Sequence, residues 1–321
     1  MAAFWKLFSF NHTNLVSMNY SRLRSIVCQS LFAALLAGTV PLASAFTYSD
    51  GDLLLVFRKD GFKDVEFNVG SVSNLLGRAN GTKVTISNWD LNLVNTTFNN
   101  NLNGVKYVLL AATDTTNALR RDWATSSSLN PLTPVTDLSG SKWGTLRAKI
   151  SAIGTEATNI TAGSASTSYV PDLNASSSYT VIVNEGQGLD LATLGGSASF
   201  PVESDVPGTL LFYELKISNA NPKPAALLVG SFCLDAAGVL TFTAGPLTPL
   251  PRPTITVVRT NTVNTISFLT TDCGNYRLRY TSDLAGPWTI APTIIMGDGT
   301  TKSLTDTTAL ALRFYVVEAF R

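Results

Sequence analysis

The chain has 321 residues, of which 45% are hydrophobic and only 14% are charged. This composition can fill one sizeable core or two, and it is far from the charged, apolar-poor composition of disordered proteins. The formal net charge is +1, and basic residues beyond residue 45 adjoin only in isolated pairs such as Arg120-Arg121. Because this offers no basic footprint, we expect neither nucleic acid nor anionic lipid as a partner.

The first 45 residues are typical of a Sec-type export signal. Arg22 and Arg24 form its basic segment, residues 31–40 form its apolar core, and the small residues Ala43-Ser44-Ala45 precede the predicted cleavage before Phe46. The apolar core is too short to span a bilayer. We therefore predict export followed by cleavage, and a secreted or cell-surface mature chain.

Two methionines are compatible with the start of this leader. Translation from Met18 gives a basic segment of ordinary length, whereas Met1 gives an unusually long leader, and both predict the same mature product. Beyond the leader, no uninterrupted apolar run reaches the roughly 18 residues of a spanning helix. We expect no transmembrane helix in the mature chain.

Strand signals dominate residues 46–245, which we predict to form a β-rich N-terminal domain. Runs of β-branched and aromatic residues alternate with turn residues, as in a β-sandwich or a curved sheet. Two short helices are expected at 72–76 and 146–153, the second with Leu146, Ile150 and Ile153 on one face. The predicted strands are residues 52–58, 64–69, 83–87, 105–112, 179–184, 209–218 and 239–243.

Three polar stretches interrupt this domain. Residues 88–103 contain seven Asn, and residues 125–128 and 155–178 are rich in Ser, Thr and Ala. Such side chains readily hydrogen-bond to their own backbone in turns. We predict long surface loops at all three places.

A proline-rich linker at residues 246–253 separates a second domain, residues 254–321. Its alternating prolines remove backbone donors and hold the chain extended. The second domain has the size and strand spacing of a small β-sandwich. Its predicted strands are residues 254–258, 265–269, 276–280, 288–290, 301–304 and 313–319.

Two resemblances accompany these patterns. Tyr276-Arg-Leu-Arg-Tyr-Thr281, Pro287-Trp288 and Arg313-Phe-Tyr315 make the second domain resemble the immunoglobulin-like or fibronectin-like module that closes many secreted bacterial proteins, which implies a non-catalytic spacer or attachment unit. Gly51-Asp-Leu-Leu-Leu-Val-Phe-Arg58 and Gly238-Val-Leu-Thr-Phe242 are similar to segments of bacterial PEP-CTERM-type exported proteins, although the sorting tail of that family is missing. The second resemblance implies an extracellular or surface setting.

Histidine chemistry is excluded from the mature chain, because the only histidine is His12, in the leader. This removes Ser-His-Asp and Cys-His catalysis and His-ligated zinc. A Ser-Lys dyad or a carboxylate pair remains open, as in a histidine-free polysaccharide hydrolase or lyase. The candidate carboxylates are Asp60, Asp64, Glu66, Asp90, Glu156, Glu185, Glu203 and Asp205.

Cys233 and Cys273 are the only cysteines beyond the leader. Export into an oxidising space allows a disulfide across the linker. The alternative is two separate buried thiols. The sequence leaves both open.

Calcium is a minor hypothesis, with Asp50 and Asp52, or Asp298 and Asp306, as oxygen ligands. Neither pair has the acidic spacing of an EF-hand loop, so turn aspartates are the preferred interpretation and no cofactor is expected.

Trp89, Trp123 and Trp143 fall near polar loops, where an exposed indole face can stack on a sugar ring. Burial in the core is the alternative that their large area favours.

These patterns predict a secreted or surface structural or adhesive protein without catalytic activity. Its possible partners are an extracellular polysaccharide and further copies of itself. The alternatives are a carbohydrate-binding protein that uses loop tryptophans, a filament subunit whose edge strands pair between copies, and the hydrolase or lyase.

Overall fold

The computed structural model describes residues 46–113, 121–127, 140–161, 168–176, 178–184, 201–216, 226–310 and 312–321. The predicted cleavage residues Ala43 and Ala45 and the candidate Glu185 lie outside these ranges. Phe46 lies inside them and is buried, with 1% of its surface exposed.

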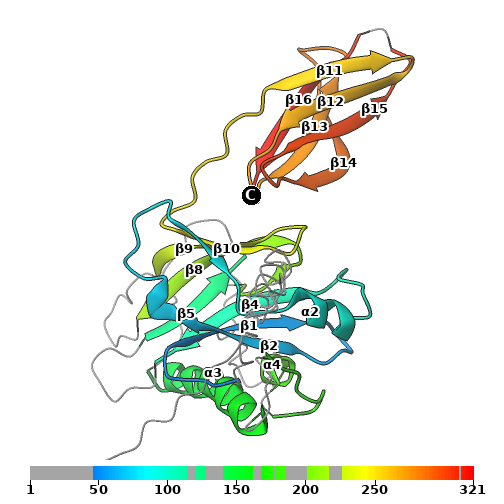
Figure 1. Ribbon diagram of the computed structural model, residues 1–321. Coiled ribbons are helices and arrows are strands. Elements are labelled where there is room, and N and C mark those ends of the chain that lie inside the picture. The colour runs from blue at the N-terminus through cyan, green and yellow to red at the C-terminus, as the bar shows by residue number, and fades with distance from the viewer. Residues whose placement is uncertain are drawn as a thin grey trace, which may run out of the picture. The chain divides into compact units, whose positions relative to one another are not determined.

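Within the described residues, ten strands form one large sheet with the order β3-β10-β9-β8-β5-β4-β1-β2-β6, and β7 pairs with β4. The sheet is antiparallel and curls as it twists (Figure 1). Its strands are β1 (Asp52–Arg58), β2 (Val65–Ser71), β3 (Lys83–Ile86), β4 (Lys106–Ala112), β5 (Arg121–Ser126), β6 (Ser168–Tyr169), β7 (Ser204–Asp205), β8 (Gly208–Lys216), β9 (Leu227–Leu234) and β10 (Leu240–Ala244).

The concave face of the sheet encloses the larger hydrophobic core. Alternate residues of each strand point into it, among them Phe57 of β1, Phe212 of β8 and Phe232 of β9. The helix α2 (Leu91–Thr97) adds Val94, with Phe98 directly after it. Successive side chains of a strand point to opposite faces of the sheet, so the intervening residues lie on the other face.

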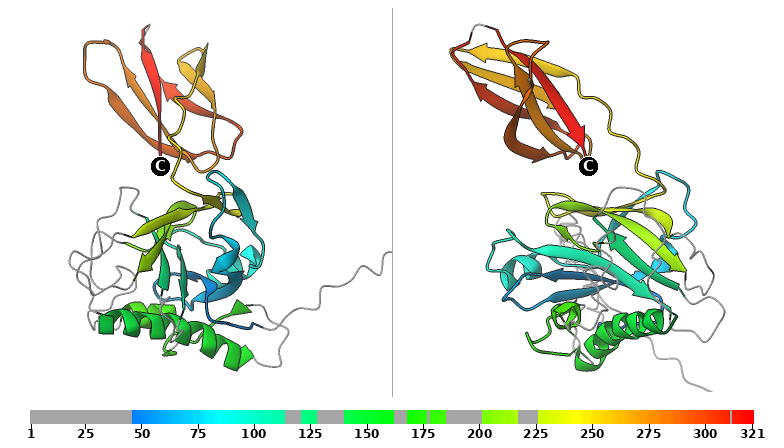
Figure 2. Two further views of the ribbon diagram at one scale, coloured as in Figure 1. Left: turned by 90° about the vertical axis from the view of Figure 1, so that its left-hand side faces the viewer. Right: turned by 180° about the vertical axis from the view of Figure 1, so that it is seen from behind.

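The opposite face of β1, β4, β5 and β8 carries a second core, covered by the helix α3 (Gly140–Thr161). Leu146, Ile150 and Ile153 lie on the buried side of α3, each with at most 1% of its surface exposed. Figure 2 shows α3 lying along this face in two further views. The short helix α4 (Tyr179–Asn184) buries Tyr179 in the same core.

Residues 254–321 form a β-sandwich of two three-stranded sheets, with the orders β11-β12-β15 and β14-β13-β16. Ile266 and Phe268 from one sheet pack against Tyr276, Leu278 and Val317 from the other. The strands are β11 (Ile255–Thr260), β12 (Val263–Leu269), β13 (Asn275–Thr281), β14 (Thr289–Met296), β15 (Thr301–Thr307) and β16 (Phe314–Phe320).

The predicted mostly β fold class, with a curved sheet and a small C-terminal β-sandwich, is confirmed, whereas the described residues contain three α-helices instead of one or two short ones. Three local predictions were wrong. Residues 179–184 form α4 rather than a strand, the Asn-rich segment contains α2, and residues 125–126 belong to β5.

Two helix predictions and one loop prediction need smaller corrections. Residues 72–74 form only a 3-10 turn, and α3 is much longer than the predicted residues 146–153. Since α3 runs to Thr161 and β6 covers residues 168–169, the segment 155–178 is only partly loop. Among the described residues, no helix is long and apolar enough to cross a membrane.

Candidate functional site

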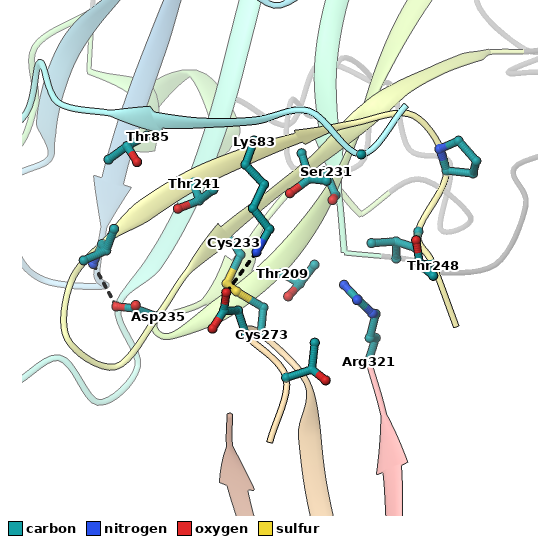
Figure 3. A pocket seen from close by; sticks show the side chains of 17 residues that line it. Lys83, Thr85, Thr209, Ser231, Cys233, Asp235, Thr241, Thr248, Cys273 and Arg321 are labelled. Atoms are coloured by element: carbon teal, nitrogen blue, oxygen red, sulfur yellow. Dashed lines mark hydrogen bonds and ion pairs between the residues drawn. A yellow bond between two sulfur atoms is a disulfide. The ribbon is translucent and has the colours of Figure 1, made fainter. Parts of the chain in front are cut away.

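A cavity of about 430 Å³ lies beside the bond between Cys233 and Cys273. Four neighbouring strands of the large sheet, β3, β10, β9 and β8, supply one wall. Residues 271–273 of the sandwich and Arg321, which follows β16, line it as well (Figure 3). Its volume falls within the roughly 300–1,000 Å³ of small-molecule sites.

The sheet wall of the cavity is made of hydroxyl side chains because of strand alternation. In β10, Leu240 and Phe242 point into the concave core, so Thr241 and Thr243 point to the other face. Thr241 pairs across the strands with Thr85 of β3. Cross-strand neighbours lie about 5 Å apart, so the hydroxyl groups form a closely spaced row.

The disulfide joins this wall to the sandwich. Cys233 occupies the same cross-strand row, between Thr241 of β10 and Thr209 of β8. Its Cα lies 6.0 Å from that of Cys273, within the usual disulfide range. Of the two alternatives left open by the sequence, the structure has the bridge.

Most charges around the cavity are engaged within the protein. Lys83 and Asp272 form an ion pair of 2.9 Å between Nζ and Oδ2. Asp235 accepts hydrogen bonds from the main-chain N–H groups of Ala237 and Val239, at 2.9 and 2.8 Å, and so closes its own turn.

Arg321 differs from these groups. Its Nε is enclosed and forms no hydrogen bond, and no Asp or Glu of the described residues pairs with its guanidinium. Burial lowers the pKa of Arg321 below its ordinary value. The hydroxyl of Thr209, which also lines the cavity, is likewise enclosed without a hydrogen-bond partner.

Two of the candidate carboxylates, Asp64 and Glu66, lie close together but are buried, with 1% and 0% of their surface exposed. Asp64 accepts hydrogen bonds from the Ser178 hydroxyl at 2.6 Å and from the Thr180 N–H at 2.7 Å, which fixes the start of α4. Burial, with the negative charge of Asp64, raises the pKa of Glu66 well above its ordinary 4.5. This pair is enclosed in the protein and lines neither the cavity beside the disulfide nor the two smaller cavities of the described residues at 53–88 and 255–315.

A third candidate, Glu203, holds a bidentate ion pair with Arg58, at 2.6 Å from Nε and 2.7 Å from Nη2. Both side chains are largely buried. Burial opposes the charge of Arg58, but the bonds to Glu203 outweigh it and raise the pKa of Arg58. The pair links β1 to the segment before β7.

The remaining candidate carboxylates are scattered. Asp90 caps the N-terminus of α2 by accepting from the Asn92 N–H at 2.8 Å. Asp60, Glu156 and Asp205 are exposed on separate elements. The structure therefore assembles no open carboxylate pair from these described residues.

The two tryptophans whose side chains the structure describes pack against the protein, as the preferred interpretation of the sequence expected, and do not form the alternative sugar platform. Trp123 has 4% of its surface exposed and packs in the concave core. Trp89 stacks on Phe57 at 5.5 Å between ring centroids, and its indole N–H donates to the Ile86 carbonyl. The side chain of Trp143 lies outside the described part of the structure.

The aspartates considered for calcium have other partners. Asp52 accepts from the Ser49 N–H and the Asn68 amide, and Asp298 accepts from Thr300 and Lys302. Asp306 binds Arg313 and the Tyr315 hydroxyl. In the described ranges no three His, Cys, Asp or Glu side chains are grouped to hold a metal ion.

Sequence reasoning missed the threonine wall and Arg321. A signal was present, since Lys83-Val-Thr85 and Leu240-Thr-Phe-Thr243 alternate polar and apolar residues with a period of two. What the sequence did not reveal is that these strands are neighbours and that residues 271–273 and Arg321 line the same cavity.

The fold and the cavity define a class: a mostly β protein in which a curled sheet and a small sandwich are covalently joined around a hydroxyl-lined cavity. Comparisons with protein-family models, curated proteins and solved structures found no match for this chain.

Proposed function

We propose that this chain is a secreted or cell-surface structural or adhesive protein that performs no catalysis. The observation that carries the proposal is the disulfide between Cys233 of the large sheet and Cys273 of the sandwich. Disulfides of this kind persist in oxidising, extracytoplasmic spaces and are rare in the cytosol. This agrees with the export signal predicted for residues 1–45.

The absence of catalysis is supported by the chemistry of the chain. The only histidine lies in the predicted leader. The described carboxylates that approach one another, Asp64 and Glu66, are enclosed in the protein. The disulfide between the sheet and the sandwich supports a binding or spacing role outside the cytoplasm.

Export and oxidation are tested on the full chain expressed in a bacterium with its own leader. We expect the product outside the cytoplasm, with an N-terminus at Phe46 and with both cysteines protected from alkylation until a reductant is added. A matched variant with Arg22 and Arg24 changed to Glu should remain in the cytoplasm. A wild-type product that stays in the cytoplasm with two free thiols would refute the proposal.

A second test addresses the structural role. The purified product is incubated with a panel of polysaccharides at several pH values, with and without calcium, and released sugars are measured. We expect none. Light scattering and negative-stain microscopy on the same sample separate a monomeric adhesive unit from an assembling structural subunit.

Carbohydrate binding is a second candidate function, and the hydroxyl-lined cavity favours it. Its wall of Thr and Ser side chains both donates and accepts hydrogen bonds, as recognition of sugar hydroxyls requires. This version differs from the predicted one, because the site uses the threonine face instead of tryptophans.

A further inference from the structure

Arg321 carries a charge that the described protein does not neutralise. Its Nε is enclosed without a hydrogen-bond partner, and none of the described carboxylates pairs with its guanidinium. The residue is partly buried, and withdrawing a charge from water is costly unless the charge is paired and hydrogen-bonded. A bound anion would remove this cost, and Figure 3 shows Arg321 extending from the end of β16 into the cavity.

The other charged groups of the cavity leave Arg321 as the cation available to a ligand. Lys83 and Asp272 neutralise each other at 2.9 Å. Asp235 is occupied by two N–H groups of its own turn. Because the guanidinium is a planar fork of donors, it matches a carboxylate, which accepts two parallel hydrogen bonds.

The hydroxyl side chains that line the cavity with Arg321 indicate the kind of molecule that would carry the anionic group. Thr85, Thr241, Ser231 and Thr209 line the same cavity from neighbouring strands. Such groups act as donors and acceptors together. They suit a ligand with several hydroxyl groups at similar spacing, as on a sugar ring.

We propose that this cavity binds a carboxylate-bearing sugar unit of an extracellular polysaccharide, with Arg321 holding the carboxylate and the threonine wall holding the sugar hydroxyls. The proposal deepens the carbohydrate-binding candidate and rests on the chain being an extracellular binding protein. The volume of about 430 Å³ accommodates a small ligand of this kind.

The test is isothermal titration of the purified, oxidised chain of residues 46–321 with trigalacturonic acid. Neutral galactotriose is the matched probe without the carboxylates. We expect binding of the acidic trisaccharide, weakened by added salt, and at least tenfold weaker binding of the neutral one. Equal affinity for the two probes, or no binding of the acidic one, would overturn the proposal.

Variants then assign the binding to the cavity. Arg321→Gln should weaken binding of the acidic trisaccharide about tenfold or more, because it removes a charge-assisted hydrogen bond to the carboxylate. Arg321→Lys keeps the positive charge but loses the planar pair of donors, so its affinity for the acidic trisaccharide should lie between those of the wild type and Arg321→Gln. Arg78→Gln removes an exposed arginine that does not line the cavity, and it should bind as the wild type does.

Three controls make these results interpretable. Melting curves of the Arg321 variants establish that they are folded, and a chain extended by Gly-Ser-Gly after Arg321 moves any terminal carboxylate away from the cavity. Thr241→Val removes one hydroxyl of the cavity wall. It should weaken binding of the trisaccharide and leave binding of inorganic sulfate unchanged. Arg321→Gln that binds like the wild type, or sulfate that binds as tightly as the trisaccharide, would refute the assignment. Because the titration uses purified protein, its failure is separate from a failure of the export test.

Discussion

Cys233 of β9 and Cys273, which precedes β13, form a disulfide that closes a 40-residue separation in the sequence. The linker of residues 246–253 lies within this loop. The sheet and the sandwich are therefore covalently joined twice, once by the linker and once by the disulfide. Cys233 also belongs to the hydroxyl row of the cavity wall. The same cysteine therefore contributes to the stability of the chain, through the disulfide, and to the wall of the cavity, through its place in this row.

Reduction of this disulfide should lower stability. On the chain-entropy model, a loop of this length contributes about 4 kcal/mol. We expect a lower melting temperature with reductant, measured by calorimetry, and the same decrease in Cys233→Ser/Cys273→Ser without reductant. The double variant should be insensitive to reductant. A wild-type melting temperature unchanged by full reduction would contradict this prediction.

Glu66→Gln should remove a pH-dependent loss of stability. The pKa of Glu66 is raised well above 4.5 by burial and by Asp64. As pH rises above the ordinary value, the unfolded chain releases the proton of Glu66 while the folded chain keeps it, so stability falls until pH passes the folded pKa.

The Glu66→Gln variant lacks this titration, so urea unfolding should show it to be close to wild type at pH 4 and more stable at pH 8. The expected gain is more than about 1 kcal/mol, because each tenfold difference in proton affinity corresponds to about that energy. Parallel stability profiles of the two proteins from pH 4 to pH 8 would count against a neutral, buried Glu66.

Breaking the ion pair of Arg58 and Glu203 should be costly. Their side chains are 14% and 6% exposed, and two short hydrogen bonds join them. Removal of one partner leaves the other charge buried, which typically costs about 3–5 kcal/mol. We expect this from Arg58→Met in chemical denaturation, and a smaller loss from Arg58→Met/Glu203→Leu.

Asp60→Asn is the matched control for the Arg58 prediction. Asp60 also contacts Arg58, at 3.1 Å, but its side chain is 95% exposed. An exposed pair contributes at most about 1 kcal/mol. If Asp60→Asn and Arg58→Met destabilised the protein equally, burial would not be the source of the effect.

Ile150→Ala should destabilise the packing of α3 on the sheet. Ile150 is fully buried in the core between α3 and strands β1, β4 and β8. Shortening a buried isoleucine costs about 2–5 kcal/mol, depending on how far the site collapses. Thermal unfolding measures this loss, and Glu156→Ala on the exposed side of the same helix should change it little.

The face of α3 shows what periodicity predicts well. Leu146, Ile150 and Ile153 were placed on one side from their spacing, and all three are buried. The strands were predicted from their β-branched and aromatic residues instead. β1 is buried on both faces, so residues 53–57 form a continuous apolar run without alternation. One-sided burial leaves a repeat in the sequence.

The segment 179–184 shows where local preference fails. Tyr-Thr-Val-Ile-Val-Asn favours a strand by residue type, yet it forms α4. Asp64, more than 100 residues earlier, accepts the Thr180 N–H and the Ser178 hydroxyl and so satisfies the start of the helix. The residues of the segment by themselves do not predict this contact, because its acceptor lies in a distant part of the chain.

The sequence by itself determined the mostly β composition, the buried face of α3, and the exclusion of histidine chemistry beyond residue 45, because these depend on residue type and near-neighbour spacing. Only the tertiary structure decided that Cys233 meets Cys273, that Asp64 and Glu66 are enclosed, and that Thr85, Thr209 and Thr241 share a wall with Arg321. Those relationships join residues that are distant along the chain, and they follow from the strand order β3-β10-β9-β8 and from the bridge to the sandwich.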